Sequence, residues 1–303
     1  MLKYVVKRII LALITIFIVC LITFFTMNAI PGGPFSGEKA KSPEVQAVLE
    51  RRFNLDKPVG TQFFLYMGNL LKGDFGISAK TGRNISDTIG SKFSVSARMG
   101  FFAVLLAIFL GVVFGSIAAL TRNHLPDRVI IFLSTLFTSL PSFVLGSFLL
   151  VIFSVKLGLV QAWSAEKQNL ILPVLSLAAY PAAYITRLTK TSMLDVLGQD
   201  YVRTARAKGV AQIKVLFLHT LRNALIPVVT YVGPMIASVL TGSLVVEQIF
   251  TIGGLGAEFV TSITNRDYPM IMGVTIFLAV FMVTMNLITD IVYKLIDPRI
   301  NLA

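Results

Sequence analysis

The sequence predicts an all-α membrane protein with about six transmembrane helices. Of its 303 residues, 55% are hydrophobic and only 14% are charged, and the mean hydropathy is +0.79. Soluble domains carry about 25% charged residues, so this composition excludes a soluble enzyme. Six segments are apolar over the roughly 20 residues that a helix needs to cross a hydrocarbon core of about 30 Å.

The six predicted spans differ in length and in the segments that separate them. They are Val5–Ala29, Ala97–Leu120, Val129–Val155, Leu170–Leu188, Ala224–Val246 and Met270–Leu295. The first begins like a signal peptide, but its apolar stretch is long for one and no clear cleavage site of small residues follows. We therefore expect it to be retained as a helix, followed by a long loop over residues 30–96.

Lysine and arginine in the short loops predict the orientation of the chain. Thirteen such residues gather at the N-terminus, in the second-to-third loop, in the segment 189–223 and in the tail: Lys3, Lys7, Arg8, Arg122, Arg128, Lys190, Arg203, Arg206, Lys208, Lys214, Arg222, Lys294 and Arg299. The opposite short loops carry only Lys156, Lys167 and Arg266. Both termini and the segment 189–223 are thus predicted to be cytoplasmic, and the loop 30–96 extracytoplasmic. The loop's aromatic run at residues 63–66 suggests that part of it packs against the protein or the membrane face.

Few ionisable residues lie inside the predicted spans. Asp290 and Arg187 fall near span ends, and Glu247 follows the fifth span. A proton- or sodium-coupled carrier is expected to place such groups or unwound helices at the membrane midplane, so the energy source is expected elsewhere. Five prolines are candidates for helix kinks: Pro141, Pro173, Pro181, Pro227 and Pro234. Gly111 and Gly115 form a GxxxG pattern that suits close helix packing but does not identify the partner helix.

The basic segment 189–223 has a helical pattern of its own. Asp200 is a plausible N-cap for two turns ending at Lys208, and Gly209 stands where a left-handed residue ends a helix. A second helix is expected over residues 212–223, with apolar residues at helical spacing: Ile213, Leu216, Phe217 and Leu221. Small Ala205 and Ala207 between cations would let a partner approach the backbone. From the residues alone, protein docking, binding to anionic lipid and simple topology charge remain open.

Residues 203–209 read Arg-Thr-Ala-Arg-Ala-Lys-Gly and resemble the EAA loop of binding-protein-dependent ABC importer permeases. That motif is Glu-Ala-Ala, three residues and Gly, then nine residues and Ile-x-Leu-Pro. Ala205 and Gly209 match it, Arg203 and Thr204 depart from it, and only Leu221 of the tail is kept. The departures are those of the peptide and nickel permeases, in which Tyr-x-Arg-Thr-Ala-Arg-Ala-Lys-Gly and His-x-Leu-Arg-Asn-Ala are usual.

Further matches to this subfamily follow in order along nearly the whole chain. They are Lys7-Arg8-Ile9-Ile10, Pro31-Gly32-Gly33-Pro34 with Gly33 in place of Asp, Gly73-Asp74-Phe75-Gly76-Ile77-Ser78, Val246-Glu247-Gln248-Ile249-Phe250, Gly253-Gly254-Leu255-Gly256, Asn265-Arg266-Asp267-Tyr268-Pro269 and Asp297-Pro298-Arg299. The chain is similar to the B-type membrane subunit of oligopeptide or dipeptide permeases. Nickel and glutathione permeases of the same family, and a stand-alone channel or carrier, are the alternatives.

The resemblance implies the type I ABC importer permease fold in a bacterial cell membrane. It divides the chain into a first transmembrane helix (1–29), an extracytoplasmic loop (30–96), a five-helix core (97–295) with a coupling region (189–223), and a cytoplasmic tail (296–303). Implied partners are a paralogous permease subunit, two ATPase subunits, an extracellular or periplasmic solute-binding protein and a peptide substrate, with no nucleic acid.

The same resemblance implies which residues meet the ATPase. Docking is expected at Tyr201, Arg203, Thr204, Ala205, Arg206, Ala207, Lys208 and Gly209. The chain contains no G-x-x-x-x-G-K-[ST] loop for ATP, so ATP and Mg²⁺ are expected on the partner subunits. No catalytic residue, cofactor or metal site is expected in this chain, which is not expected to be an enzyme. Substrate contacts are not assigned.

Overall fold

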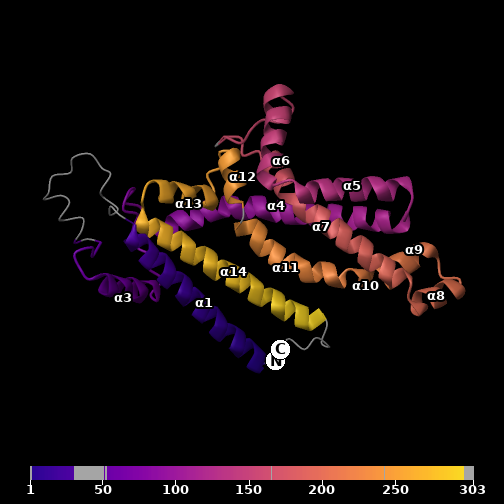
Figure 1. Ribbon diagram of the computed structural model, residues 1–303, viewed down its shortest axis with the longest axis horizontal. Coiled ribbons are helices and arrows are strands. Elements are labelled where there is room, and N and C mark those ends of the chain that lie inside the picture. The colour runs from indigo at the N-terminus through magenta and orange to yellow at the C-terminus, as the bar shows by residue number, and fades with distance from the viewer. Residues whose placement is uncertain (1, 31–50, 52, 165, 242, 297–303) are drawn as a thin grey trace. The chain divides into compact units, whose positions relative to one another are not determined.

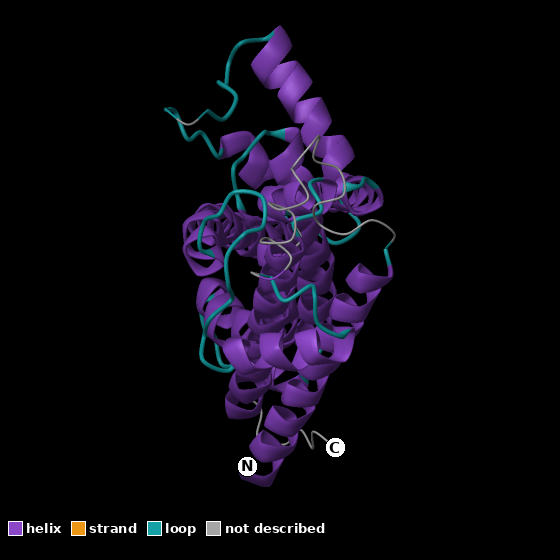
Figure 2. Cartoon of the chain, turned by 90° about the vertical axis from the view of Figure 1, so that its left-hand side faces the viewer, coloured by secondary structure: helices purple, strands orange, loops and turns teal. Residues whose placement is uncertain are grey.

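The computed structural model of this chain describes residues 2–30, 51, 53–164, 166–241 and 243–296. Within these residues the secondary structure is helical and no strand forms, apart from one isolated bridge between Ile77 and Asn84 (Figures 1 and 2). The Pro31–Pro34 match lies outside the described residues, as does the tail 296–303 except for residue 296. The chain divides into two compact units, Met1–Val95 with Gly253–Val283, and Ser96–Ile252 with Thr284–Ala303.

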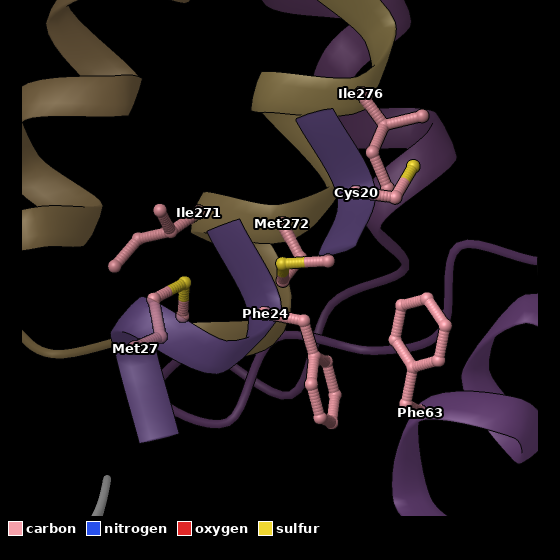
Figure 3. Packing of buried hydrophobic residues seen from close by; sticks show 7 residues of the cluster. All are labelled: Cys20, Phe24, Met27, Phe63, Ile271, Met272 and Ile276. Atoms are coloured by element: carbon pink, nitrogen blue, oxygen red, sulfur yellow. The ribbon is translucent and has the colours of Figure 1, made fainter. Parts of the chain in front are cut away.

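The first unit combines the N-terminal helix with elements from both ends of the sequence. It contains α1 (Leu2–Ala29), α3 (Val59–Leu70), the start of α4 (Ile85–Leu120), α13 (Leu255–Thr264) and most of α14 (Tyr268–Ile296). Its main core joins side chains of α1, α3 and α14: Cys20, Phe24, Met27, Phe63, Ile271, Met272 and Ile276 (Figure 3). Phe63 is almost fully buried there, so part of the long loop packs against the protein.

A polar link holds the loop after α3 to the start of α14. The Ser78 hydroxyl donates to Asp267, and the backbone N–H of Ala79 donates to Asp267 Oδ1 at 3.0 Å. Asp267 is buried and immediately precedes α14, where an acidic residue suits the partial positive charge of a helix N-terminus. The residues from 76 to 85 are therefore ordered by tertiary contacts rather than left as a slack loop.

The second unit is arranged around α7 (Ile171–Leu197). Its other elements are the remainder of α4, α5 (Leu125–Ser139), α6 (Ser142–Leu149), the π-helix η1 (Leu150–Lys156), α8 (Asp200–Ala207), α9 (Gln212–Lys214), the π-helix η2 (Val215–Leu221), α10 (Arg222–Ala224), α11 (Ile226–Thr241) and α12 (Leu244–Ile249). Helices α5, α6 and α11 all contact α7. The partner of the GxxxG pattern is also α7, because a Cβ at Gly111 would lie 2.5 Å from Ile185 Cβ and one at Gly115 would lie 2.6 Å from the carbonyl oxygen of Thr186.

Among the described residues, four helices are long and apolar enough to cross a membrane, and the number of candidate spans rises to six if each of two bent helix pairs forms one span. The straight candidates are Val6–Ala29, Ile85–Leu120, Ile171–Leu197 and Tyr268–Ile291. The third predicted span is instead Leu125–Ser139 followed by Ser142–Lys156 at 105°, and the fifth is Gln212–Ala224 followed by Ile226–Val239 at 50°. Helix count and fold class agree with the prediction, whereas the third and fifth spans are broken.

Prolines account for the position of these breaks. Leu140 adopts an extended conformation immediately before Pro141, as steric conflict with the proline ring requires. Pro227 lies in the first turn of α11, directly after the second break, and Pro173 lies in the first turn of α7. Pro181 and Pro234 are accommodated inside α7 and α11. Two of the five predicted kinks thus coincide with sharp bends.

The fourth predicted span lies almost wholly within a longer helix. Hydropathy ends it at Leu188, but α7 continues to Leu197 and ends at Gly198. The loss of hydropathy marks where apolar residues stop, whereas a helix ends where backbone geometry and capping end it. The polar segment therefore begins as a continuation of α7, and α8 follows after only two residues.

Candidate coupling surface

Helix α8 presents a short, basic helical turn bounded by well-defined ends. It runs from Asp200 to Ala207, and Gln199 in an extended conformation occupies the N-cap position. The prediction that Asp200 is the N-cap is wrong by one residue. Asp200 is instead the first helical residue, where its carboxylate lies 3.8 Å from Arg203 in an exposed ion pair and its carbonyl accepts from the Thr204 hydroxyl.

Gly209 ends α8 in the left-handed conformation, as predicted. Its φ is +75°. The N–H of Gly209 donates to the carbonyl of Arg206, and the N–H of Val210 donates to that of Ala205. This pair of bonds is the Schellman arrangement, which needs a residue with positive φ at the position of Gly209. The turn directs the chain back toward α9.

Ala205 is buried, unlike the other residues of the predicted docking set. Val202, Ala205 and Val215 form a small buried cluster against Val196, Leu197 and Val210. Because Val202 and Ala205 are three residues apart, they share the face of α8 that packs on the chain itself. The other seven predicted residues are exposed: Tyr201, Arg203, Thr204, Arg206, Ala207, Lys208 and Gly209. We call these seven the coupling surface.

The second helical stretch departs from the predicted pattern. It is divided into α9, the π-helix η2 and α10, and the wider π-turn changes which side chains share a face. Ile213 and Phe217 are exposed, while Leu216 and Leu221 pack against Ala119, Met193 and Ala224. The four apolar residues expected on one face are therefore split between two.

Polar contacts tie the coupling surface to its surroundings. The Asn223 side-chain amide donates to the Tyr201 hydroxyl at 2.9 Å, which connects α8 to α10. About two turns before the C-terminal end of α7, Lys190 Nζ lies 2.5 Å from Asp127 Oδ1 of α5. The other carboxylate oxygen of Asp127 accepts a hydrogen bond from the backbone N–H of Asn123. Among the residues that the structure describes, Arg206 and Lys208 make no ion pair. Their positive charges are available to an acidic partner.

In the second unit, two buried carboxylates stand out that the sequence did not single out as buried. Asp127 is almost fully buried and Glu247 completely so. Glu247 Oε1 accepts from the Ser96 hydroxyl at 2.6 Å and from the Ser243 hydroxyl at 2.5 Å, joining α12 to α4. The sequence offered one signal for the contact of Glu247 with Ser243. Ser243 stands four residues before Glu247, and that spacing places two side chains on one helical face.

The described part of the chain does not gather ligands for a metal ion, because no group of three or more His, Cys, Asp or Glu side chains comes together there. In the Gly253–Gly256 cluster, Gly253 and Gly254 precede α13, and Leu255 and Gly256 are its first two residues. A nucleotide-binding glycine loop would follow a strand.

Comparison with known proteins agrees with this geometry. The family model described as "Binding-protein-dependent transport system inner membrane component" matches residues 111–302, and the corresponding N-terminal model matches residues 1–100. A dipeptide transport system permease protein of Bacillus subtilis is 42% identical, with 100% of this chain and 99% of the relative covered. An oligopeptide transport system permease protein of Haemophilus influenzae is 41% identical, with 99% of this chain and 100% of the relative covered.

Solved structures agree in fold. An inward-facing MetNI methionine ABC transporter matches with a TM-score of 0.55 at 16% identity, covering 69% of this chain and 95% of that chain. An amino acid ABC transporter crystallised with histidines matches with a TM-score of 0.53 at 17% identity, covering 71% and 95%. At these identities the likeness concerns the fold alone. The family models and the full-length relatives together show that the chain belongs to the binding-protein-dependent transport system inner membrane components.

Proposed function

We propose that this chain is a pore-forming subunit of an ATP-driven importer that takes up peptides delivered by an external solute-binding protein. The names of its full-length relatives, which are dipeptide and oligopeptide permeases, support the cargo. The exposed coupling surface supports the energy source, because an ordered basic turn outside the apolar spans suits a protein partner. A paralogous permease subunit completes the pathway, and ATP and Mg²⁺ bind to two separate ATPase subunits.

The coupling step rests on the continuity between α8 and α7. Only Gly198 and Gln199 separate the two helices, and Val202 and Ala205 pack against the end of α7. Closure of the ATPase pair around ATP displaces α8, and α7 carries that displacement into the bundle. Such a mechanism is a two-state equilibrium biased by a ligand on another chain. The protein resides in the bacterial cell membrane with both termini cytoplasmic.

Charge reversal on the coupling surface tests this proposal. We expect the double variant Arg206→Glu/Lys208→Glu to lose co-purification of the ATPase subunits while the permease itself remains folded, since both side chains are exposed and unpaired in the described structure. Arg128→Glu is the matched control, because Arg128 is an exposed cation in the first turn of α5. Equal loss of the ATPase from the control and the double variant would argue against a specific docking surface.

The cargo and the energy source are tested with the complete reconstituted complex. Uptake of labelled peptide is expected to require ATP, the ATPase subunits and the binding protein, and to be competed by unlabelled peptide but not by nickel or glutathione. Competition by nickel or glutathione would instead identify the corresponding alternative importers of this family. Uptake that persists without any ATPase subunit would contradict the importer and support a stand-alone channel or carrier.

A further inference from the structure

One face of α7 is polar where a lipid-facing helix would be apolar. The exposed residues of α7 recur at intervals of three to five along its length: Ile171, Leu175, Tyr180, Tyr184, Arg187, Thr191 and Asp195. From Tyr180 onward every one of them carries a polar group. The opposite face is buried and mainly apolar, with Leu177, Ala182 and Ile185 among its members. We call the part from Tyr180 to Arg187 the polar stripe.

The polar stripe lies at membrane depth. Tyr180 and Tyr184 follow the start of α7 by roughly 14 Å and 20 Å at 1.5 Å per residue, within a hydrocarbon core of about 30 Å. Tyrosine concentrates at membrane interfaces, and ionisable residues in spans face a protein interior or a water-filled path. Tyr180 and Tyr184 are nevertheless 46% and 40% exposed. This face therefore suits an aqueous path rather than lipid.

Helix α11 adds polar groups beside the stripe. The ring of Tyr231 lies 4.3 Å from that of Tyr184, measured between centroids, at an interplanar angle of 32°. Pro234 and Ser238 are exposed on α11, one and two turns further along. Pro234 has no N–H to donate to the carbonyl of Thr230, as the helical pattern would require. Helices α7 and α11 thus offer tyrosine hydroxyls and a backbone acceptor, the carbonyl of Thr230, beside one another.

Arg187 is the charged member of this group. Its side chain is exposed, and among the described residues it makes no ion pair. A guanidinium binds a carboxylate through two parallel hydrogen bonds. Tyrosine hydroxyls both donate and accept, and their rings offer apolar contact area. A ligand with one carboxylate, repeated amides and varied side chains matches these groups.

We propose that Tyr180, Tyr184, Arg187 and Tyr231 form a binding site for the peptide in transit, in which the Arg187 guanidinium binds the peptide's C-terminal carboxylate and the tyrosines contact its backbone. The site rests on the proposed function and assigns residues to its substrate. The site binds the C-terminal carboxylate and the backbone, which every free peptide has, so the pathway accepts peptides of different sequence. Selection by side chain is left to other components.

The test compares one peptide with a free C-terminal carboxylate and the same peptide as a C-terminal amide. Transport rates are measured in proteoliposomes with the complete complex at saturating binding protein, and each variant's rate is divided by the wild-type rate for that peptide. Any preference of the binding protein cancels in this ratio. We expect Arg187→Gln to slow the free acid about tenfold, the loss of one charge-assisted contact, and to leave the amide unchanged. Arg187→Lys keeps the charge and is expected to retain most of the acid rate.

The possible outcomes distinguish a substrate-binding role of Arg187 from a merely structural one. Equal ratios for the acid and the amide, whether both fall or neither does, would overturn the assignment of Arg187. Phe109→Ala is the control, because Phe109 is an exposed apolar residue of α4 and is expected to leave both rates unchanged. A wild-type complex that hydrolyses ATP without moving either peptide would instead overturn the peptide cargo, and the site with it.

Photo-crosslinking gives a second readout that does not need transport of the amide. A peptide with a benzophenone next to its free C-terminus is incubated with the complete complex during ATP turnover, and the labelled residues are mapped by mass spectrometry. We expect label between Tyr180 and Arg187 or at Tyr231, and its loss when the unlabelled free acid is in excess. Label confined to α4, or label in the bundle that the free acid does not reduce, would overturn the site.

Discussion

At the scale of single residues, the two alanines of α8 differ in a way that their sequence context hides. Ala205 is 8% exposed and packs against Val202 and Val215, whereas Ala207 is exposed. Both stand between cations in the sequence. The difference arises because η2 covers one face of α8, and only the positions three residues apart on that face are buried. A substitution meant to test docking must therefore use Ala207.

We expect Ala205→Glu to destabilise the protein, because it buries a carboxylate without a partner. An unpaired buried charge costs several kcal/mol, and about 3 kcal/mol or more is expected here. The measurement is the thermal unfolding midpoint of the purified chain in detergent. Ala207→Glu is the matched control and is expected to leave the midpoint unchanged while it weakens ATPase binding. Equal midpoints for the two variants would mean that Ala205 is not buried in the assembled protein.

A second residue-scale prediction concerns the left-handed turn. Gly209→Ala is expected to cost about 1 kcal/mol, the penalty for a Cβ at positive φ, and Gly209→Asn less, because asparagine tolerates this conformation better. Thermal unfolding again provides the measurement. Gly198→Ala is the control, since Gly198 has φ −79° and an added Cβ would meet only ordinary contacts, the nearest at 3.5 Å. If Gly198→Ala and Gly209→Ala lose the same stability, backbone strain is not the cause.

At the scale of elements, α7 organises the second unit through close contacts that have different origins. Small residues of α4 let its backbone approach α7 at Gly111 and Gly115. An ion pair joins α7 to α5 through Lys190 and Asp127. The GxxxG spacing is visible in the sequence, but its partner helix is not, and the ion pair likewise depends on which helices become neighbours.

Gly115→Ala is expected to separate α4 from α7. The added Cβ would lie 2.6 Å from the carbonyl oxygen of Thr186, which is backbone and cannot rotate away. Overpacking of this kind costs about 1–3 kcal/mol, and a lowered unfolding midpoint is the observable. Gly90→Ala on the same helix meets nothing within 4 Å and should be neutral or slightly stabilising. A neutral Gly115→Ala would show that the two helices do not approach this closely.

The ion pair between α5 and α7 predicts a non-additive pair of substitutions. Lys190→Met leaves the buried Asp127 carboxylate without its cation, and removal of one partner of a buried pair costs about 3–5 kcal/mol. Asp127→Asn/Lys190→Met removes both charges and is expected to cost less than Lys190→Met alone. A double-mutant cycle on the unfolding midpoint measures the coupling. Strict additivity would show that the two side chains do not interact.

At the scale of the whole molecule, each compact unit has a distinct role in the proposed importer. The second unit contains α7, the coupling surface and the polar stripe, so both the proposed energy input and the proposed peptide contacts belong to it. The first unit gathers the N-terminal helix, α3 and most of α14 around an apolar core. Only 11% of the most apolar 18-residue segment of α1 is buried. The helix therefore leaves most of its apolar surface to lipid or to a partner subunit.

Composition and hydropathy predicted the membrane class and the approximate number of spans, because solvation in lipid depends on the apolar length of a segment and not on its neighbours. The glycine turn at Gly209 was equally predictable, since positive φ is a local property of the backbone. Motifs read along the chain predicted the family. These features were available from the residues because their physical causes are local.

Only the tertiary structure decided which faces of the helices are covered. Hydropathy could not place the end of α7, since a helix continues after its residues turn polar. The π-helix η2 changes which side chains share a face, and Ile213 and Phe217 are exposed as a result. The packing of α8 on η2 buries Ala205. The burial of Glu247 and Asp127, and the outward placement of Tyr180, Tyr184 and Arg187, follow from which helices become neighbours. Neighbourhood is a long-range property, and the order of residues in one chain does not specify it directly.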